Sequence, residues 1–402
     1  MFSTERKVGP LFLVVLALIT ALLPLSMHLF FPALPSVMAD FSSSEAMVNL
    51  TVSVPLFVMA LMSLVYGFLS DKFGRRPVLL CSIGFFVLGS VLSAMATDMW
   101  MLICGRFLQA AGGGGGLGLA RVIARDVFGA DRLVKVLSYL TMAYAIGPMV
   151  SGPLGGAVAD LGGWRAVLIV ASVLGILIGL ISFFVIFETN KNVADGSRGQ
   201  TPFEDYRRLF TNPRFVAFIL QSGFTSSVFF TMAAASSFLM IDYLGRSPSE
   251  YGLYFICFPF GFLVGSLLSA YVAGRVKVET MVLLGSIVMV VGTLTQAGFL
   301  LSGIVTPLTI FLPGFFAISA QGIALPNAQS GAINVAGPLA GSAAGIGVFI
   351  QLLAAALATQ VYGIIADGTP VPMAIAVSIC ALLGLAVGSI PFLLSARDAR
   401  KC

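Results

Sequence analysis

One histidine, one arginine and one glutamine bring hydrogen-bonding chemistry into stretches that are otherwise apolar. His28 is the only histidine and lies near the end of the first apolar stretch, and Arg106 lies inside the fourth. At 1.5 Å per helical residue, His28 would lie roughly 10 Å before the end of its helix and Arg106 roughly 10 Å after the start of its own. These two helix ends lie on the same side if successive helices alternate in direction. A neutral imidazole can accept from a guanidinium, whereas a protonated one would be repelled by it. These residues, with Gln109 one turn beyond Arg106, predict a pocket in which protons compete with a ligand.

Both charged positions also have structural explanations. His28 could donate to a backbone carbonyl that Pro32 leaves free, and Arg106 could extend along its helix until the guanidinium reaches the membrane interface. An arginine held deep in a span costs about 3 kcal/mol, so we expect Arg106 to face a cavity or a partner. For His28 the binding and the structural explanations stay open.

A charged loop, residues 67–80, separates two long apolar stretches and places one acid and three bases within six residues. The Asp71 carboxylate could accept from an arginine at the end of the fourth stretch, Arg121 or Arg125. It could also face the positive N-terminus of the eleventh predicted helix. The alternative is an ordinary turn in which Gly74 supplies a positive φ.

Small residues replace large side chains along part of the fifth apolar stretch. Such residues let a neighbouring helix approach closely, and prolines remove backbone donors from the helix. Five consecutive glycines, residues 112–116, allow the same approach in the fourth stretch. We expect tight contacts, and close packing alone does not distinguish a proton barrier from simple helix packing. The set in the fifth stretch is Gly147, Pro148, Gly152, Pro153, Gly155 and Gly156.

The elements that position these residues are membrane helices. The chain is 58% hydrophobic with a mean hydropathy of +1.02. Its apolar runs of about 20 residues can each cross a hydrocarbon core of roughly 30 Å. Continuous runs without alternation favour helices over barrel strands, so the predicted fold class is all-α, an integral membrane protein with twelve transmembrane helices. The predicted spans are residues 11–34, 46–68, 77–97, 99–119, 137–158, 165–187, 213–236, 251–273, 280–301, 307–326, 340–363 and 371–394.

Two six-helix halves are predicted. The longest polar stretch, residues 188–212, separates an N-terminal bundle, residues 1–187, from a C-terminal bundle, residues 213–402. Residues 78–83 recur as residues 282–287 with one change, which supports an internal duplication. Duplicated halves are typical of secondary transporters, in which the binding site lies between the halves near the bilayer midplane.

Positive charge predicts the orientation. If the N-terminus is cytoplasmic, every lysine and arginine outside the spans falls on that side except Arg165 and Arg246. Cytoplasmic loops carry such an excess, so both termini are predicted to be cytoplasmic. The net charge of +5 follows from this bias, and we expect no nucleic-acid partner.

Other chemistries are not favoured by the sequence. The five cysteines are scattered without paired spacing, which predicts neither a disulfide framework nor a metal site. The sequence contains no phosphate-binding loop, so an ion gradient must drive any active transport. One histidine and few acids within the spans do not make an intramembrane enzyme. We expect no cofactor, with protons as the coupling ion.

The charged loop resembles the signature of the major facilitator superfamily, Gly-x-Leu-x-Asp-x-x-Gly-Arg-Arg/Lys. Residues 102–112 are similar to the family's fourth-helix motif centred on Arg106, and residues 147–156 to its fifth-helix antiporter motif. The resemblance implies that the loop and the end of the fourth helix hold the cytoplasmic gate closed. The implied gate motif is Gly67, Asp71, Gly74, Arg75, Arg76, Arg121, Arg125 and Asp126.

Further stretches resemble the bicyclomycin/chloramphenicol-resistance branch of drug:proton antiporters. They are Pro32–Pro35, Arg121–Asp126, Pro326–Ala328 and Ala340–Ala343. Where many members carry an aspartate four residues before the first of these prolines, this chain has His28. The resemblance implies proton-coupled antiport in a bacterial cytoplasmic (inner) membrane, without the usual acidic proton carrier.

The predicted function is secondary active export of small amphipathic, drug-like compounds by alternating access of a monomer in the lipid bilayer. Phenylalanine, methionine and small polar residues within the spans predict an apolar cavity with few hydrogen-bonding groups. The alternatives are a metabolite facilitator or importer, which the missing acid keeps open, and a sensor that does not transport. The candidate cavity residues are Phe57, Met62, Tyr144, Gln221, Phe224, Phe229, Met232, Phe258 and Gln351.

Overall fold

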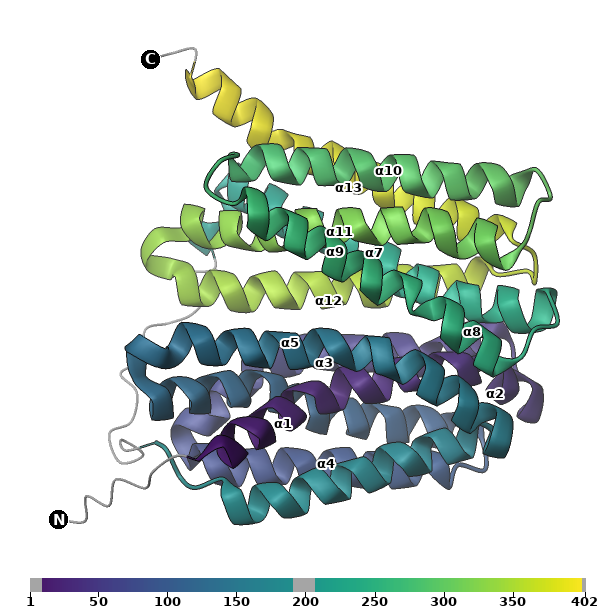
Figure 1. Ribbon diagram of the computed structural model, residues 1–402, viewed down its shortest axis with the longest axis horizontal. Helices are drawn as coiled ribbons and strands as arrows, with labels where there is room; N and C mark the ends of the chain where they lie inside the picture. The colour runs from purple at the N-terminus through teal and green to yellow at the C-terminus, as the bar shows by residue number, and fades with distance from the viewer. Residues whose placement is uncertain (1–8, 191–206, 400–402) are drawn as a thin grey trace.

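The computed structural model describes residues 9–190 and 207–399, and most of these residues are helical. In Figure 1 the helices lie side by side in two groups. A helix satisfies its backbone hydrogen bonds within one segment, which is what an apolar run in lipid requires. The all-α fold expected from the sequence is confirmed.

The two helix groups follow the order of the chain. The first group, purple to teal in Figure 1, is α1 (Pro10–Leu29), η1 (Phe31–Ala33), α2 (Leu34–Asp40), α3 (Glu45–Phe73), α4 (Arg75–Ala94) and α5 (Met99–Val185). The second group, teal-green to yellow, is α7 (Pro213–Phe238), η2 (Leu239–Tyr243), α8 (Pro248–Phe255), α9 (Cys257–Val272), α10 (Val278–Leu301), α11 (Pro307–Ala336), η3 (Gly337–Leu339), α12 (Ala340–Ile365) and α13 (Val371–Ala399).

Helix α5 contains 87 residues and passes through the bundle three times. A straight helix of that length would span about 130 Å. Its Arg165 donates to Asp40 at one end of the bundle. Asp126 and Glu188, the latter just beyond its last turn, both accept from Arg75 at the other end. The chain therefore reverses within α5, which holds the predicted spans 99–119, 137–158 and 165–187.

Twelve membrane crossings fit these helices. Within the described residues, nine segments are long and apolar enough to cross a membrane. Two of them, Lys135–Val185 with 51 residues and Pro307–Ile365 with 59, are long enough for two crossings each. The first part of α5 supplies the remaining predicted span. The division into halves at residues 188–212 stays a prediction, because most of that stretch lies outside the described residues.

Several helix boundaries differ from the predicted spans, and three of these differences involve a glycine or a proline. Helix α3 continues to Phe73, where Gly74 ends it with φ of 93°. Helix α11 continues ten residues past 326, to Ala336, because Pro326 is accommodated inside the helix. The predicted span 251–273 is broken at Ile256 into α8 and α9. Pro259 explains the break, since it has no N–H to donate to the carbonyl four residues earlier.

Glycines bring α4 and α5 together backbone to backbone. A Cβ on Gly112 would overlap the backbone of Ser82 and Phe86, and one on Gly105 would lie 2.6 Å from the Ser93 nitrogen. On α4, a Cβ on Gly89 would lie 2.6 Å from the Gly105 carbonyl oxygen. This close approach limits the space around Arg106 and Gln109, the first buried polar side chains of α5.

Candidate functional site

The two helix groups are hydrogen-bonded to each other at one end of the bundle. We call this end, where Asp40 and Glu45 lie, the Asp40 end, and the opposite end, where Asp71 and Asp126 lie, the Asp71 end. The bonds between the groups run from Tyr362 Oη to Glu45 Oε1 (2.6 Å), Ser53 Oγ to Gln360 Oε1 (2.7 Å), Gln360 Nε2 to the Ala46 carbonyl (3.1 Å), Ser237 Oγ to the Phe31 carbonyl (2.6 Å) and the Ser249 nitrogen to Asp160 Oδ2 (3.0 Å).

Helices α5 and α8 also meet at the Asp40 end through their backbones. A Cβ on Gly252 of α8 would lie 2.8 Å from the Gly152 carbonyl carbon and 3.1 Å from Pro153 Cα. A Cβ on Gly156 would overlap the Pro248 carbonyl oxygen. We call Gly152, Gly156 and Gly252 the glycine seam. The seam lets the backbones of α5 and α8 approach each other closely, with the Phe255 side chain packed against Gly152.

The other small residues of the predicted antiporter motif face different neighbours. A Cβ on Gly155 would overlap the Leu29 carbonyl of α1, and one on Gly147 would lie 3.6 Å from the Leu25 nitrogen, also in α1. Pro148 lines a cavity. The motif therefore contacts α1 on one side and α8 on the other, and its role as a proton barrier stays a prediction.

Three cavities lie between the groups, from the Asp71 end to the middle of the bundle. The largest, about 290 Å³, is lined by Gly67, Ser70 and Arg121 at the Asp71 end and by Tyr144 deeper inside. A second, about 150 Å³, extends from Arg121 to the first turns of α12. The third, about 90 Å³, shares Tyr144 with the largest and is called the central cavity here. The molecule is thus hollow toward the Asp71 end and sealed at the Asp40 end.

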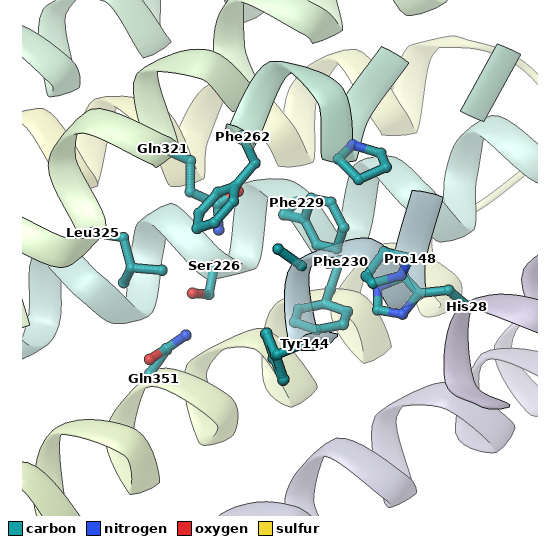
Figure 2. Close-up of a pocket in the computed structure, with 12 residues that line it drawn as sticks. His28, Tyr144, Pro148, Ser226, Phe229, Phe230, Phe262, Gln321, Leu325 and Gln351 are labelled. Carbon is teal, nitrogen blue, oxygen red and sulfur yellow. The ribbon is translucent and has the colours of Figure 1, made fainter. Parts of the chain in front are cut away.

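The walls of the central cavity are mostly aromatic and apolar (Figure 2). Phe229 and Phe230 of α7 and Phe262 of α9 contribute rings, and Pro148 closes one end beside His28. Such walls suit ligands of varied shape, because they offer contact area with few fixed directions.

Three polar atoms of residues that line the central cavity have no hydrogen-bond partner within the described part of the chain. They are His28 Nε2, Ser226 Oγ and Gln321 Oε1, and all three are buried. A fourth polar side chain, Gln351, is partly engaged, because its Oε1 accepts from Gln329 Nε2 at 2.9 Å, while its own Nε2 remains a donor. The free atoms come from α1, α7 and α11, so both helix groups contribute to the site.

The ring of His28 is held in one orientation. Its Nδ1 lies 2.5 Å from the Pro24 carbonyl, so Nδ1 carries a proton and the neutral ring presents Nε2 as an acceptor. The structural explanation named the wrong carbonyl: the acceptor belongs to Pro24, not to one that Pro32 frees. Four phenylalanine rings surround the imidazole with centroids 5.6 to 6.2 Å away, those of Phe31, Phe229, Phe230 and Phe255.

Arg106 lies inside the first helix group and does not reach the membrane interface. It is only 2% exposed. Its Nε donates to the Thr51 carbonyl at 3.1 Å and its Nη1 to Gln109 Oε1 at 2.5 Å. The guanidinium carbon lies 4.6 Å from the centre of the Phe30 ring, within cation–π range.

Gln109 extends this network to two more helices. Its Nε2 donates to Ser26 Oγ at 2.9 Å and to Ser90 Oγ at 2.7 Å. Arg106 and Gln109 therefore tie α1, α3 and α4 to α5, and neither lines any of the three cavities.

The prediction that His28 and Arg106 share one pocket is wrong. The two residues lie at similar levels of the bundle, because Arg106 stacks on Phe30 and Gln109 bonds to Ser26, on either side of His28 in α1. Arg106 faces the interior of the first helix group, however, whereas His28 lines the central cavity. Their depth in a membrane stays a prediction.

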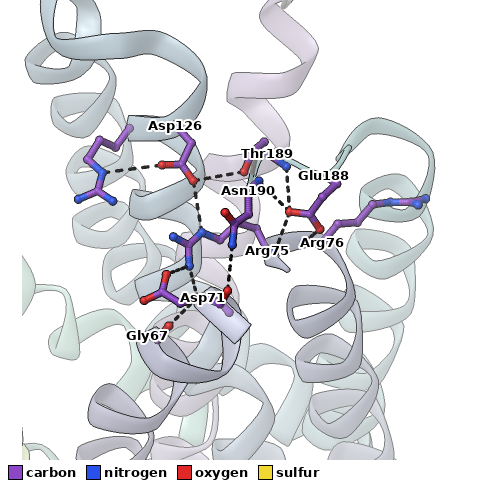
Figure 3. Close-up of polar contacts among 10 residues, drawn as sticks. Gly67, Asp71, Arg75, Arg76, Asp126, Glu188, Thr189 and Asn190 are labelled. Carbon is purple, nitrogen blue, oxygen red and sulfur yellow. Dashed lines mark hydrogen bonds and ion pairs between the residues drawn. The ribbon is translucent and has the colours of Figure 1, made fainter. Parts of the chain in front are cut away.

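At the Asp71 end, Arg75 is the centre of a charged cluster (Figure 3). Its Nη1 lies 2.5 Å from Asp71 Oδ1 and 2.6 Å from Ser70 Oγ, and its Nε lies 3.3 Å from Asp126 Oδ2. Arg75 is buried, whereas Asp71 is half exposed. The cluster joins α3, α4 and the middle part of α5 within the first helix group.

Glu188 caps the N-terminus of α4. Its two carboxylate oxygens accept from the backbone N–H groups of Arg75 (2.9 Å) and Arg76 (3.2 Å), where the helix dipole favours an anion (Figure 3). Gly74 has φ of 93°, and a Cβ there would meet the Glu188 carboxylate. The sequence therefore predicted the positive φ of Gly74 correctly and missed the capping acid.

The gate contacts expected of Asp71 differ from those in the structure. Asp71 pairs with Arg75 and not with Arg121 or Arg125. Arg125 is exposed and lies 3.8 Å from Asp126. Arg121 lines the cavities beside the first turns of α12. These contacts fit the cavities that the described residues leave at the Asp71 end, and the role of the motif as a gate stays a prediction.

We expect Arg75→Ala to destabilise the fold. The change leaves Asp71 and Asp126 without their shared cation, and we expect a loss of about 2 kcal/mol, less than for a fully buried pair because Asp71 reaches solvent. Thermal unfolding in detergent measures the effect. Lys72→Ala is the control, because Lys72 is exposed. Equal melting temperatures for the two variants would contradict the role given to Arg75.

Sequence reasoning found some cavity residues and missed others. Tyr144, Phe229 and Gln351 line the central cavity, and Met62 lines the largest one. Gln321 was missed, although a glutamine within the apolar span 307–326 was a usable signal. Ser226 is one of several serines and threonines in α7, and nothing in the sequence distinguishes it. Among the other candidates, Gln221 and Phe258 are buried outside the cavities and Phe57 is exposed.

Comparison with known proteins connects this geometry to a family. A family model described as Major Facilitator Superfamily matches residues 16–359. The chain belongs to the major facilitator superfamily. It is 27% identical over 375 residues to the uncharacterized MFS-type transporter YdgK of Bacillus subtilis, with 92% of each chain covered. It is 29% identical over 281 residues to the multidrug resistance protein MdtL of Salmonella typhi, with 70% of each chain covered.

Solved structures of the superfamily share the fold. A bacterial homologue of the human lysosomal transporter Spinster, in an inward-facing and occupied conformation, matches with a TM-score of 0.76 and 17% identity over 96% of both chains. A D-xylose-proton symporter matches with a TM-score of 0.73 and 15% identity over 95% of both chains. This superfamily member is therefore a multi-pass membrane transporter and not an enzyme.

Proposed function

We propose that this superfamily member exports small amphipathic, drug-like compounds in exchange for protons, acting as a monomer. The observation that carries the proposal is the aromatic central cavity, built by both helix groups in a molecule hollow at one end and sealed at the other. That geometry suits alternating access around a site between two bundles. The names of the MdtL relatives and the four stretches similar to the bicyclomycin/chloramphenicol-resistance branch support a drug-like substrate.

The proposed orientation places the Asp71 end in the cytoplasm of a bacterium, with the protein in the inner membrane. The charged cluster and Arg121 lie at this end, whereas Arg165 lies at the Asp40 end, as the excess of cytoplasmic positive charge requires. In this orientation the cavities are open to compounds arriving from the cytoplasm. The Asp40 end, closed by the glycine seam, would then open to release them outside.

For coupling, we propose that a proton and the substrate compete for His28 Nε2. In the neutral ring this nitrogen is a free acceptor in the wall of the central cavity, and protonation turns it into a donor. A substrate donor bonded to Nε2 and a proton on Nε2 exclude each other. Such exclusion is what exchange requires, and it uses no acidic residue in α1.

Transport in everted membrane vesicles tests the proposed function. We expect uptake of a fluorescent amphipathic drug when a proton gradient is imposed, and loss of uptake when a protonophore collapses it. Uptake that survives the protonophore would favour the second candidate, a facilitator or importer that does not use protons, which the absence of an acid in α1 supports. A purified protein that binds the compound and never moves it across liposomes would contradict both.

His28→Gln tests the coupling step. Glutamine keeps an acceptor and cannot take up a proton in this range, so we expect substrate affinity to lose its pH dependence. In the wild type, competition with one proton weakens binding up to about tenfold per pH unit of acidification. Binding titrations between pH 5.5 and 8.5, together with gradient-driven uptake, measure this. If the wild type and His28→Gln show the same pH dependence, His28 does not carry the proton.

A further inference from the structure

The unpartnered polar atoms of the central cavity indicate what kind of ligand it binds. His28, Ser226 and Gln321 are 5%, 1% and 5% exposed, so their free atoms are shielded from bulk solvent, and all three side chains line the cavity (Figure 2). Buried polar groups that the protein leaves unpaired favour a ligand that pairs with them.

Two of these three atoms can only accept hydrogen bonds. The carbonyl oxygen of Gln321 has no proton to give, and Nε2 of neutral His28 is an acceptor because Nδ1 donates to Pro24. The hydroxyl of Ser226 can adapt to either role. A ligand can pair with these two acceptors only through N–H or O–H donors of its own, although the Tyr144 hydroxyl and the amide nitrogens of Gln321 and Gln351 in the same lining can also donate to it.

The charge of the lining argues against a cation as that donor. Among the residues that the structure describes, no aspartate or glutamate lines any of the three cavities, and Arg121 lines both cavities nearest the Asp71 end. A cation in the central cavity would lose its hydration without gaining a counter-charge, which is costly at such a site. A neutral amide, hydroxyl or sulfonamide group offers the same donors without that cost.

The cavity walls add a requirement on shape. Rings of Phe229, Phe230 and Phe262 surround a space of about 90 Å³, which favours a flat aromatic group. The rest of a larger compound can extend past Tyr144 into the cavity of about 290 Å³. From these observations we infer that the central cavity selects uncharged aromatic compounds carrying hydrogen-bond donors, and discriminates against organic cations. This inference rests on the proposed function and narrows its substrate class.

A matched series of fluorescent probes tests the inference on the purified full-length protein in detergent. Dansylamide is neutral and carries two N–H donors on its sulfonamide nitrogen. N,N-dimethyl dansylamide is also neutral, but its sulfonamide nitrogen carries no N–H. A dansylamide bearing a trimethylammonium-ethyl group is cationic. We expect dansylamide to bind at least about tenfold more tightly than either of the others, as a hydrogen bond lost in a buried site implies. Equal or tighter binding of the cation would overturn the inference, and so would failure of all three to bind.

Two variants test whether a difference in affinity between the dansyl probes arises in the central cavity. Gln321→Leu removes one acceptor, so we expect weaker binding of dansylamide and unchanged binding of the N,N-dimethyl compound. Ser226→Ala is the second variant, to be used if Gln321→Leu does not fold. Thr231→Val is the matched control, because Thr231 Oγ1 is also buried without a partner but lies outside the cavity lining. Equal losses for both neutral compounds in Gln321→Leu would contradict the hydrogen bond.

The probes also separate this inference from the proposed function. If everted vesicles take up the cationic dansyl compound in a proton-dependent way and exclude dansylamide, export stands and the selectivity inference fails. If dansylamide binds as expected but vesicles never move it, the selectivity stands and the proposed export fails.

Discussion

Gly156→Val is expected to abolish transport while leaving the protein folded. A side chain at this position would overlap the Pro248 carbonyl and lie within 2.8 Å of Ser249 Cα. Both are backbone atoms of α8, so neither can rotate away, and the Asp40 end cannot close as it does here. Overpacking of this kind costs about 3 kcal/mol, which corresponds to roughly a hundredfold loss of the closed state. Each helix group can still fold, because the clash arises only where the groups meet.

Two measurements check this expectation. Transport in everted vesicles gives the loss of function, and labelling of Asn49→Cys with an impermeant maleimide reports opening of the Asp40 end, where Asn49 is now buried against Gly363. Gly84→Val is the control, since a Cβ on Gly84 meets nothing within 4 Å. Wild-type transport and slow labelling in Gly156→Val would show that the seam is not a gate.

Arg106→Ala should cause the largest loss of stability among the polar variants. It removes the donors to Thr51 and Gln109 and leaves space beneath the Phe30 ring. Hydrogen bonds in membrane proteins contribute about 0.6 to 1.7 kcal/mol each, so with the lost packing we expect a loss of about 3 kcal/mol. Arg106 is a buried cation without an acidic partner, so its removal also removes a desolvation cost, which offsets part of this loss.

Thermal unfolding in detergent, followed through tryptophan fluorescence, measures the effect of Arg106→Ala. Arg106→Lys keeps the charge but not the planar set of donors, so we expect it to restore little. Dansylamide affinity, measured well below the melting temperature, should stay within about twofold of wild type because Arg106 lines no cavity. A variant that is stable but no longer binds would mean that Arg106 acts on the ligand.

The fold class could be predicted from the sequence because the length and composition of the apolar runs indicate membrane helices. Only helices and closed barrels satisfy their backbone in lipid, and continuous apolar runs favour helices. The orientation that the lysines and arginines indicate stays a prediction. The errors in the predicted spans came from helix ends: α11 continues past Pro326, and the break near Ile256 depends on Pro259. Whether a proline ends, bends or fits a helix is decided by neighbouring helices, which a single sequence does not reveal.

The candidate site could be predicted only in part. The sequence indicates how far along its helix a residue lies, but not the direction in which its side chain points. Helix rise predicts similar depths for His28 and Arg106, but the rotation of each helix about its axis is set by packing. Glycines of α4 and α5 turn Arg106 into the first helix group, whereas His28 faces the second. The cap from Glu188 to Arg75 joins residues 113 positions apart and left no local signal.

The glycine seam has a consequence for how this transporter can change over generations. Any substitution at Gly152, Gly156 or Gly252 adds at least a Cβ, and each Cβ meets backbone. In a mutational scan for transport, these three positions should accept almost no substitution. Positions in the cavity wall, such as Leu325 and Phe262, should accept many side chains. Selection by a new toxic compound would then change residues of the cavity wall and leave the glycine seam unchanged. The substrate could therefore change without any change in the conformational cycle.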